Sequence, residues 1–187
     1  GIPNMKLDKS IIDMRIEIME QEGIKFHTNT NIGGNDENAI SMDDLIEAND
    51  IVLLTTGATK PRDLPIANRE GSGVHFAMEF LGENTKSLLD SDLADENFIN
   101  AKDKDVIVIG GGDTGNDCLG TSLRHGCKSL TNFEIMPELP KDRLENNPWP
   151  LFPRIYKVDY GHEESREVFG KDPREYSVSG KEFIRDE

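Results

Sequence analysis

The sequence lacks long apolar runs. The longest, such as Ile51–Leu54 and Val106–Ile109, are far below the roughly 20 residues that a membrane-spanning helix needs. The opening GIPN also lacks the basic and apolar regions of a secretory leader. We therefore expect no membrane partner. Because no initiating Met is present, we expect a fragment or a processed product. The expected location is the cytoplasm or an organelle (plastid or mitochondrion). The sequence does not choose between them, because any targeting region would precede Gly1.

Basic residues and cysteines are both scarce. With 21 Lys and Arg against 36 Asp and Glu, the net charge is −15, which argues against a nucleic-acid partner because phosphates need cationic side chains. Cys118 and Cys127 are nine positions apart and belong to no CxxC motif. Two isolated thiols cannot by themselves hold an iron–sulfur centre or a tetrahedral zinc ion. We expect both to be reduced packing residues of an intracellular protein.

Catalytic signatures are missing as well. His27, His75, His125 and His162 show no metal-binding spacing, so packing or surface roles are expected for each. No serine lies in a GxSxG elbow, and neither cysteine lies in a nucleophile motif. A nucleotide cofactor that carries its own chemistry would need none of these groups. The sequence therefore predicts no catalytic side chain and no metal ligand.

The first third of the chain does contain periodic segments. Residues 8–22 have the spacing of an amphipathic helix, and Gly23 follows as its stop. Alternation predicts a short strand over 24–28, and a capping-box pattern predicts a helix over 41–48. The apolar residues 51–55 are typical of a parallel strand that is covered on both faces.

Residues 82–104 are acidic and show no clear period, so we expect an irregular connection. Two interpretations stay open for this segment: a docking patch, or a solvated surface connection.

A strand–helix–strand unit follows this connection. Residues 106–109 read as a strand, residues 114–125 as a helix closed by Gly126, and residues 129–135 as the next strand. Together they form a βαβ unit of about thirty residues. The rest of the chain is expected to hold a Pro- and aromatic-rich loop over 146–153, a helix over 163–169 and a strand over 176–178.

The βαβ unit carries a GxGxxG pattern at Gly110, Gly112 and Gly115. The first glycine permits the turn out of the strand, the second lets the backbone approach a pyrophosphate, and the third lets the helix pack closely on the sheet. The helix N-terminus then favours the negative charge. Asp113 suits a capping or hydrogen-bonding role better than a phosphate contact. A purely structural glycine turn is the alternative interpretation.

An acidic residue is expected at the end of the second strand, and Glu134 stands there, 22 residues after Gly112. A carboxylate at this position accepts from a ribose hydroxyl and repels a 2′-phosphate, which favours NADH over NADPH. Lys141 and Arg143 lie just downstream, where they could instead reach a phosphate. The alternative is that Glu134 is simply a solvated residue at the end of a strand.

Seven stretches resemble, in the same order, the small (β) subunit of glutamate synthase or the equivalent C-terminal region of fused NADH-dependent forms. They are GIPNMKLDK, TTGATKPRDLPI, GVHFAMEFL, VIGGGDTGNDC, NNPWPLFPR, VDYGHEE and FGKDPREYSV. The resemblance implies an α/β, two-dinucleotide-binding-domain flavoprotein of Rossmann-like, glutathione-reductase type, present here as an internal fragment. The implied domains are a partial FAD-binding domain over 1–81, the acidic connection over 82–104 and a partial NAD(P)H-binding domain over 105–187.

The same resemblance implies the cofactor contacts. Thr56, Gly57 and Ala58 match the flavin-adjacent signature, whose alternative is a plain strand-to-loop turn. The NAD(P)H fingerprint and the ribose position supply the remaining site residues: Gly110, Gly111, Gly112, Asp113, Thr114, Gly115, Asn116 and Glu134.

The resemblance also implies an activity and a partner. NAD(P)H would reduce FAD, and iron–sulfur clusters held outside this chain would pass the electrons to FMN in the large subunit or fused large-subunit region. There, glutamate is made from glutamine and 2-oxoglutarate in ammonia assimilation. The FAD fingerprint and the cluster cysteines would precede Gly1. Two alternatives stay open: another FAD/NAD(P)H reductase of the superfamily, or an inactive module that only binds nucleotide or assembles with a partner.

Overall fold

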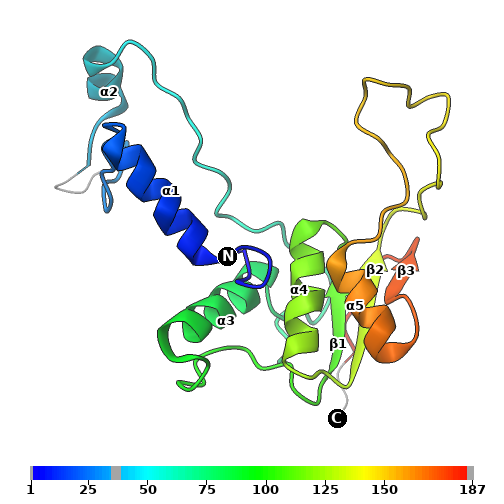
Figure 1. The fold of residues 1–187 in the computed structure, drawn as a ribbon. Helices are drawn as coiled ribbons and strands as arrows, with labels where there is room; N and C mark the ends of the chain where they lie inside the picture. The colour runs from blue at the N-terminus through cyan, green and yellow to red at the C-terminus, as the bar shows by residue number, and fades with distance from the viewer. Residues whose placement is uncertain (1, 35–38, 185–187) are drawn as a thin grey trace. The chain divides into compact units, whose positions relative to one another are not determined.

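The structure is a computed structural model that describes residues 2–34 and 39–184 (Figure 1). It divides into two compact units. Residues 8–62 form one, and the described residues of 1–7 and 63–187 form the other. None of its described helices is long and apolar enough to cross a bilayer.

The larger unit is built on a parallel sheet in the order β1-β2-β3, formed by Asp105–Ile109, Ser129–Glu134 and Arg174–Tyr176. Helix α4 (Asp113–Arg124) connects β1 to β2, and α5 (Tyr160–Phe169) lies between β2 and β3. The two helices pack side by side on the sheet (Figure 1). The predicted α/β class and the βαβ unit are therefore confirmed, and the arrangement is consistent with a Rossmann-like fold.

A small apolar core lies between α4, the sheet and a third helix, α3 (Ala77–Ser91). Its buried members are Leu81, Ala101, Val108, Cys118, Leu119, Cys127 and Leu130. Both cysteines are free and buried, so their predicted packing role is confirmed. Burial raises the pKa of the Cys118 thiol to about 12, which leaves it protonated and unreactive near neutral pH.

His125 ties α3 to the end of α4. Its Nε2 lies 2.7 Å from Oδ1 of Asn84, and its Nδ1 accepts from the backbone N–H of Ala101 at 3.2 Å. The ring also packs against Phe80 and Phe98. Because the Ala101 amide already occupies Nδ1, the neutral ring donates through Nε2. The packing role expected for this histidine is confirmed.

The opposite face of the sheet carries exposed apolar residues. Ile107 is 58% exposed and Ile109 is 51% exposed, whereas Val108 between them is buried against the helices. Side chains alternate between the two faces of a strand, so the apolar run of β1 is covered on one face among the described residues.

The smaller unit contains α1 (Lys9–Gln21) and α2 (Met42–Ala48), both close to their predicted bounds. Asp8 caps α1 by accepting from the backbone N–H of Ser10, and Ser41 caps α2 by accepting from that of Asp44. None of the described residues of 8–62 is buried, although many of them are large and apolar.

Four predictions on secondary structure are wrong. No strand forms over 24–28 or 51–55, and Ile51 and Leu53 are more than four-fifths exposed. A parallel strand needs partners for its backbone groups, and no described residue pairs with these segments. Residues 82–91 are helical rather than irregular because Leu81, Asn84, Thr85 and Ser87 bury one face of α3, which packs on α4. The last strand ends at Tyr176 instead of beginning there.

Candidate functional site

The glycine loop joins β1 to α4. Gly110 has a φ of +107°, which a residue with a side chain rarely adopts, so the predicted turn out of the strand requires glycine here. A Cβ on Gly115 would overlap the carbonyl oxygen of Gly110, which explains the close approach of helix and strand at this point. A Cβ on Gly112 would meet no atom within 4 Å. The space beside Gly112 is open to a ligand.

The N-terminus of α4 faces that open space. Its N-cap is Gly112, and no side chain of the described residues caps it. The capping role predicted for Asp113 is therefore wrong: Asp113 is the first residue of the helix and is exposed. Free N–H groups and the helix dipole make such an uncapped end an attractive position for an anion.

Glu134 ends β2 directly beside the loop. A Cβ on Gly111 would overlap the Glu134 carboxylate, so the two residues are in close contact. Burial raises the pKa of Glu134 above its ordinary value, against the opposing influence of the Arg174 guanidinium. The structure thus brings the predicted ribose residue to the glycine loop, with its carboxylate held against the backbone of Gly111.

Asn132 holds the loop in place, and the sequence analysis missed it. Its side chain is fully buried, and its Nδ2 donates to the backbone carbonyls of Val108 at 3.1 Å and Gly110 at 3.0 Å. The available signal was a polar residue at an inward-facing position of a predicted strand, between Leu130 and Glu134. Its two donated hydrogen bonds offset part of the cost of burying this amide, whose Oδ1 has no partner among the described residues.

A cleft of about 440 Å³ lies over this loop. One wall consists of Gly111–Asp113, Asn116 and Glu134, and another consists of residues that follow β2, including Phe152 and Lys157. Its volume lies within the range of small-molecule sites. The predicted residues Gly111, Gly112, Asp113, Asn116 and Glu134 therefore share one cavity wall.

The floor of the cleft contains buried nitrogen atoms with no partner. Asn116 accepts through Oδ1 from the N–H of Gly161 at 3.0 Å, but its Nδ2 makes no hydrogen bond within the described part of the chain. His162 accepts through Nδ1 from the N–H of Asp159 at 3.2 Å, and its Nε2 is likewise unpaired there. Buried donors are normally hydrogen-bonded. These two nitrogens are therefore positioned to donate to acceptor oxygens of a ligand.

Arg174 fixes the far side of the cleft. It donates to Asp172, to the hydroxyl of Tyr156 at 2.5 Å and to the carbonyl of Lys157 at 2.8 Å. Burial alone would raise the pKa of Asp172. Hydrogen bonds from Arg174 and Arg166 outweigh this effect and hold the pKa well below its usual range. Arg174 is thus held in a fully bonded cluster at the start of β3 and cannot swing freely toward a ligand.

Lys141 and Arg143, which lie just downstream of Glu134 in the sequence, do not line the cleft. Arg143 donates to the backbone carbonyls of Asn147 and Leu151, and neither it nor Lys141 lines the cavity. The cationic lining residues are Lys157 and Arg174. Residues 157 and 174 reach the cavity through the folding of the loop and the pairing of β3, which spacing from the glycines could not predict.

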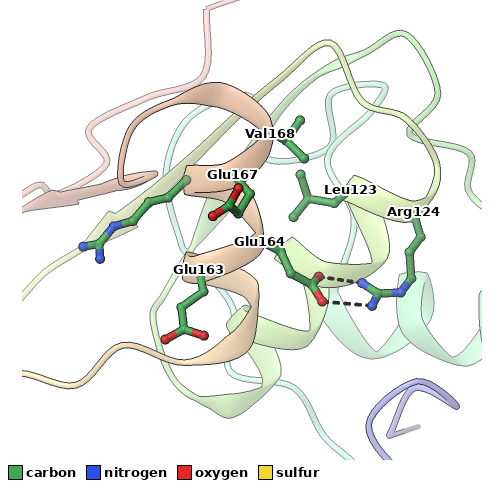
Figure 2. A pocket seen from close by; sticks show the side chains of 7 residues that line it. Leu123, Arg124, Glu163, Glu164, Glu167 and Val168 are labelled. Carbon is green, nitrogen blue, oxygen red and sulfur yellow. Dashed lines mark hydrogen bonds and ion pairs between the residues drawn. The ribbon is translucent and has the colours of Figure 1, made fainter.

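A second, larger hollow of about 710 Å³ lies at the other end of α4, against α5 (Figure 2). Its lining includes Glu163, Glu164 and Glu167, and Glu164 accepts two hydrogen bonds from Arg124 at 2.7 and 3.0 Å (Figure 2). Carboxylates repel phosphate, and both arginines that line the hollow are already paired, Arg124 with Glu164 and Arg166 with Asp172. This hollow does not suit a nucleotide, although it is the larger of the two.

Thr56, Gly57 and Ala58 belong to the other unit. They lie in an exposed irregular segment, where Gly57 has a φ of +69°. The described residues around them form no regular strand. The structure therefore leaves the flavin-adjacent assignment of these three residues as a prediction.

The chain is similar to several known proteins. No protein-family model matches it. It is 58% identical over its whole length to "Glutamate synthase [NADH]" of Schizosaccharomyces pombe, of which it covers 9%. It is 54% identical over 98% of its length to "Glutamate synthase [NADH]" of Saccharomyces cerevisiae, of which it covers 8%. It is 50% identical over its whole length to "Glutamate synthase [NADPH] small chain" of Bacillus subtilis, of which it covers 37%.

Over its whole length the chain is similar to glutamate synthases. Its resemblance to that family, inferred from seven stretches of sequence, is confirmed. The chain spans about a tenth of the yeast glutamate synthases and just over a third of the bacterial small chain. Both NADH- and NADPH-named glutamate synthases are among its relatives, so this similarity alone does not fix the cofactor.

Proposed function

We propose that the larger unit binds the pyridine nucleotide of a glutamate synthase reductase, with NADH preferred over NADPH. The main support is the contact between Glu134 and Gly111 in the wall of the cleft. The N-terminus of α4, which no described side chain caps, lies at the same cleft. The lining residues match the chemistry of a dinucleotide. An open space beside Gly112 and unpaired nitrogens on Asn116 and His162 suit a ligand rich in acceptor oxygens.

Each residue has a binding role in this proposal. The pyrophosphate lies at the first turn of α4, where Gly112 permits close approach and the amides of Asp113, Thr114 and Gly115 face it. Gly110 and Gly115 shape the turn and the helix contact. Glu134 accepts from the adenine ribose and disfavours a 2′-phosphate by charge repulsion. When bound, the nicotinamide supplies the hydride, so no side chain of this chain needs to act as acid, base or nucleophile.

In the complete enzyme, we propose, this hydride passes to FAD and supplies electrons for glutamate synthesis from glutamine and 2-oxoglutarate. Thr56, Gly57 and Ala58 would lie near the flavin, which rests on the resemblance and on the names of the relatives. Iron–sulfur clusters and the large subunit, or its fused equivalent, would belong to the part of the enzyme that this chain does not span.

The exposed apolar segments support assembly with that larger part. Residues 51–54 have the composition of a buried parallel strand, and yet Ile51 is 84% exposed. Ile107 and Ile109 leave one face of β1 uncovered. Parallel sheets are normally covered on both faces. We propose that the parts of the enzyme that this chain does not span supply partner strands for residues 51–54 and cover the exposed face of β1.

Isothermal titration with NADH and with NADPH tests the nucleotide site. We expect NADH to bind more tightly, and Glu134→Ala to weaken NADH binding and reduce the preference. Glu175→Ala is the matched control, because this glutamate is on the neighbouring strand and does not line the cleft. Absence of binding by either cofactor would reduce this chain to an inert or assembly module. Tighter NADPH binding would overturn the role given to Glu134.

A further inference from the structure

The loop between β2 and α5 is ordered by its own hydrogen bonds. It projects from the sheet beyond the end of β2 (Figure 1). Its two ends are joined by the N–H of Tyr156, which donates to the carbonyl of Pro140 at 2.7 Å, and its tip is closed by the N–H of Leu151 to the carbonyl of Pro148. Compact surface loops whose ends lie close together and whose own side chains pack them are frequently functional.

Asn147 is the centre of this loop. It is only 6% exposed, although most of its neighbours in the loop are exposed. Its Oδ1 accepts from the N–H of Arg154 at 2.8 Å, and its Nδ2 donates to the carbonyl of Phe152 at 3.0 Å. Arg143 adds hydrogen bonds to the carbonyls of Asn147 and Leu151. The backbone around Phe152 is therefore fixed before any ligand binds.

Phe152 lines the same cleft as Glu134 and Gly111 and is 77% exposed. The Nζ of Lys157 lies over its ring, 4.6 Å from the centroid. Trp149, on the same loop, is 82% exposed but does not line the cleft. An aromatic ring in the wall of a cleft offers a flat surface to a planar ligand group.

The position of Phe152 relative to the glycine loop indicates which group that is. If the pyrophosphate lies at the N-terminus of α4 and the ribose at Glu134, the base must continue beyond the end of β2. Met136 and Pro137, which directly follow the end of β2, line the cleft together with Phe152. Planar bases stack readily on aromatic side chains, whatever their hydrogen-bonding edge.

We propose that residues 140–156 form the adenine-binding wall of the dinucleotide site, with Phe152 stacking on the base and Asn147 acting as a positioning residue. This inference rests on the proposed function. Because the loop is already ordered, little conformational entropy is lost when the base binds.

The first test compares Phe152→Leu with Trp149→Leu by titration with NADH and with ADP-ribose, which carries the adenine but no nicotinamide. Phe152→Leu should weaken both ligands about tenfold, as the loss of a stacking partner does. Trp149→Leu should leave both affinities unchanged. Nicotinamide mononucleotide, which lacks adenine, should bind equally to the wild type and to Phe152→Leu.

The second test addresses Asn147. Asn147→Asp keeps the acceptor for Arg154 but replaces the donor to the Phe152 carbonyl by a carboxylate oxygen. It should weaken ADP-ribose binding by several-fold, and its effect should nearly vanish in the Phe152→Leu background. A residue with a merely structural role would give additive losses instead.

The outcomes separate this proposal from the proposed function. If Glu134→Ala weakens NADH binding while Phe152→Leu does not, the nucleotide site stands and the adenine wall is wrong. If Phe152→Leu changes the sedimentation of the protein but not its nucleotide affinity, the loop is a protein-docking surface and the proposal is overturned. If the wild type binds neither NADH nor ADP-ribose, the proposed function itself fails and the adenine wall fails with it.

Discussion

The carboxylate of Glu134 occupies the space that a side chain at position 111 would need. The two residues are 23 positions apart in sequence and come together because β1 and β2 pair in register, Ile109 opposite Phe133. Gly111 is one of the unspecified positions of GxGxxG. In the structure, however, any side chain at this position would overlap the Glu134 carboxylate. The identity of residue 111 decides where the carboxylate at the end of β2 can lie.

Gly111→Ala should therefore change cofactor preference more than stability. The obstructing group is the flexible end of Glu134, which can swing aside at small cost. We expect NADH binding to weaken several-fold because the carboxylate leaves the ribose position, and NADPH binding to weaken less. Titration of both cofactors, with a thermal melt of the variant, measures this. An unchanged NADH to NADPH ratio would contradict it.

Gly112→Ala and Gly115→Ala should separate binding from folding. At Gly112 a Cβ meets open space, so Tm should stay within a degree or two while both NADH and NADPH bind less tightly. At Gly115 a Cβ meets the backbone carbonyl of Gly110, which cannot move aside cheaply. We expect this variant to lose about 1–3 kcal/mol of unfolding free energy in urea denaturation. Equal loss of stability in the two variants would refute the assignment.

Asn132→Ala should destabilise the unit that contains the sheet. The change removes two hydrogen bonds and leaves the carbonyls of Val108 and Gly110 without this partner in a buried place. The expected loss is about 1–3 kcal/mol of unfolding free energy. Thr131→Ala, at the neighbouring position on the other face of the strand, is the control and should cost less. Denaturant midpoints of the three proteins decide the matter.

Stability should fall in mild acid because of His162. Burial, reinforced by the nearby Arg174 guanidinium, lowers the pKa of His162 to about 4. The folded state then binds fewer protons than the unfolded state, whose histidine titrates near the ordinary 6.5. The contribution is complete above pH 6.5 and is lost as the pH falls toward 4, on the order of 3 kcal/mol in all.

Unfolding free energies at several pH values check this prediction. His162→Gln should flatten the curve between pH 6.5 and 4, whereas His27→Gln, at an exposed position, should leave it unchanged. Below pH 4 the loss should continue in both variants, because Asp172, whose pKa is lowered by its arginine partners, becomes protonated there. A pH profile that His162→Gln does not alter would show that another group is responsible.

Local sequence was enough for elements whose signals are local. The cap at Ser41, the stop at Gly23 and the βαβ unit around Gly110 were predictable because turn, cap and alternation depend on neighbouring residues. Glu134 was predictable from its spacing, since a strand, a helix and a strand of ordinary lengths bring that position back to the loop. The strand over 51–55 failed for the opposite reason: its pattern requires partner strands that no described residue supplies.

The α/β pattern, the glycine loop, the acidic residue beside it and the resemblance to glutamate synthases could thus all be read from local sequence. Three features required the folded chain: Gly111 makes room for Glu134, Asn132 secures the turn, and Lys157 and Arg174 rather than Lys141 and Arg143 line the cleft. The physical reason is that strand pairing and side-chain hydrogen bonds join residues far apart in the chain. No local period or spacing records which of these distant groups meet.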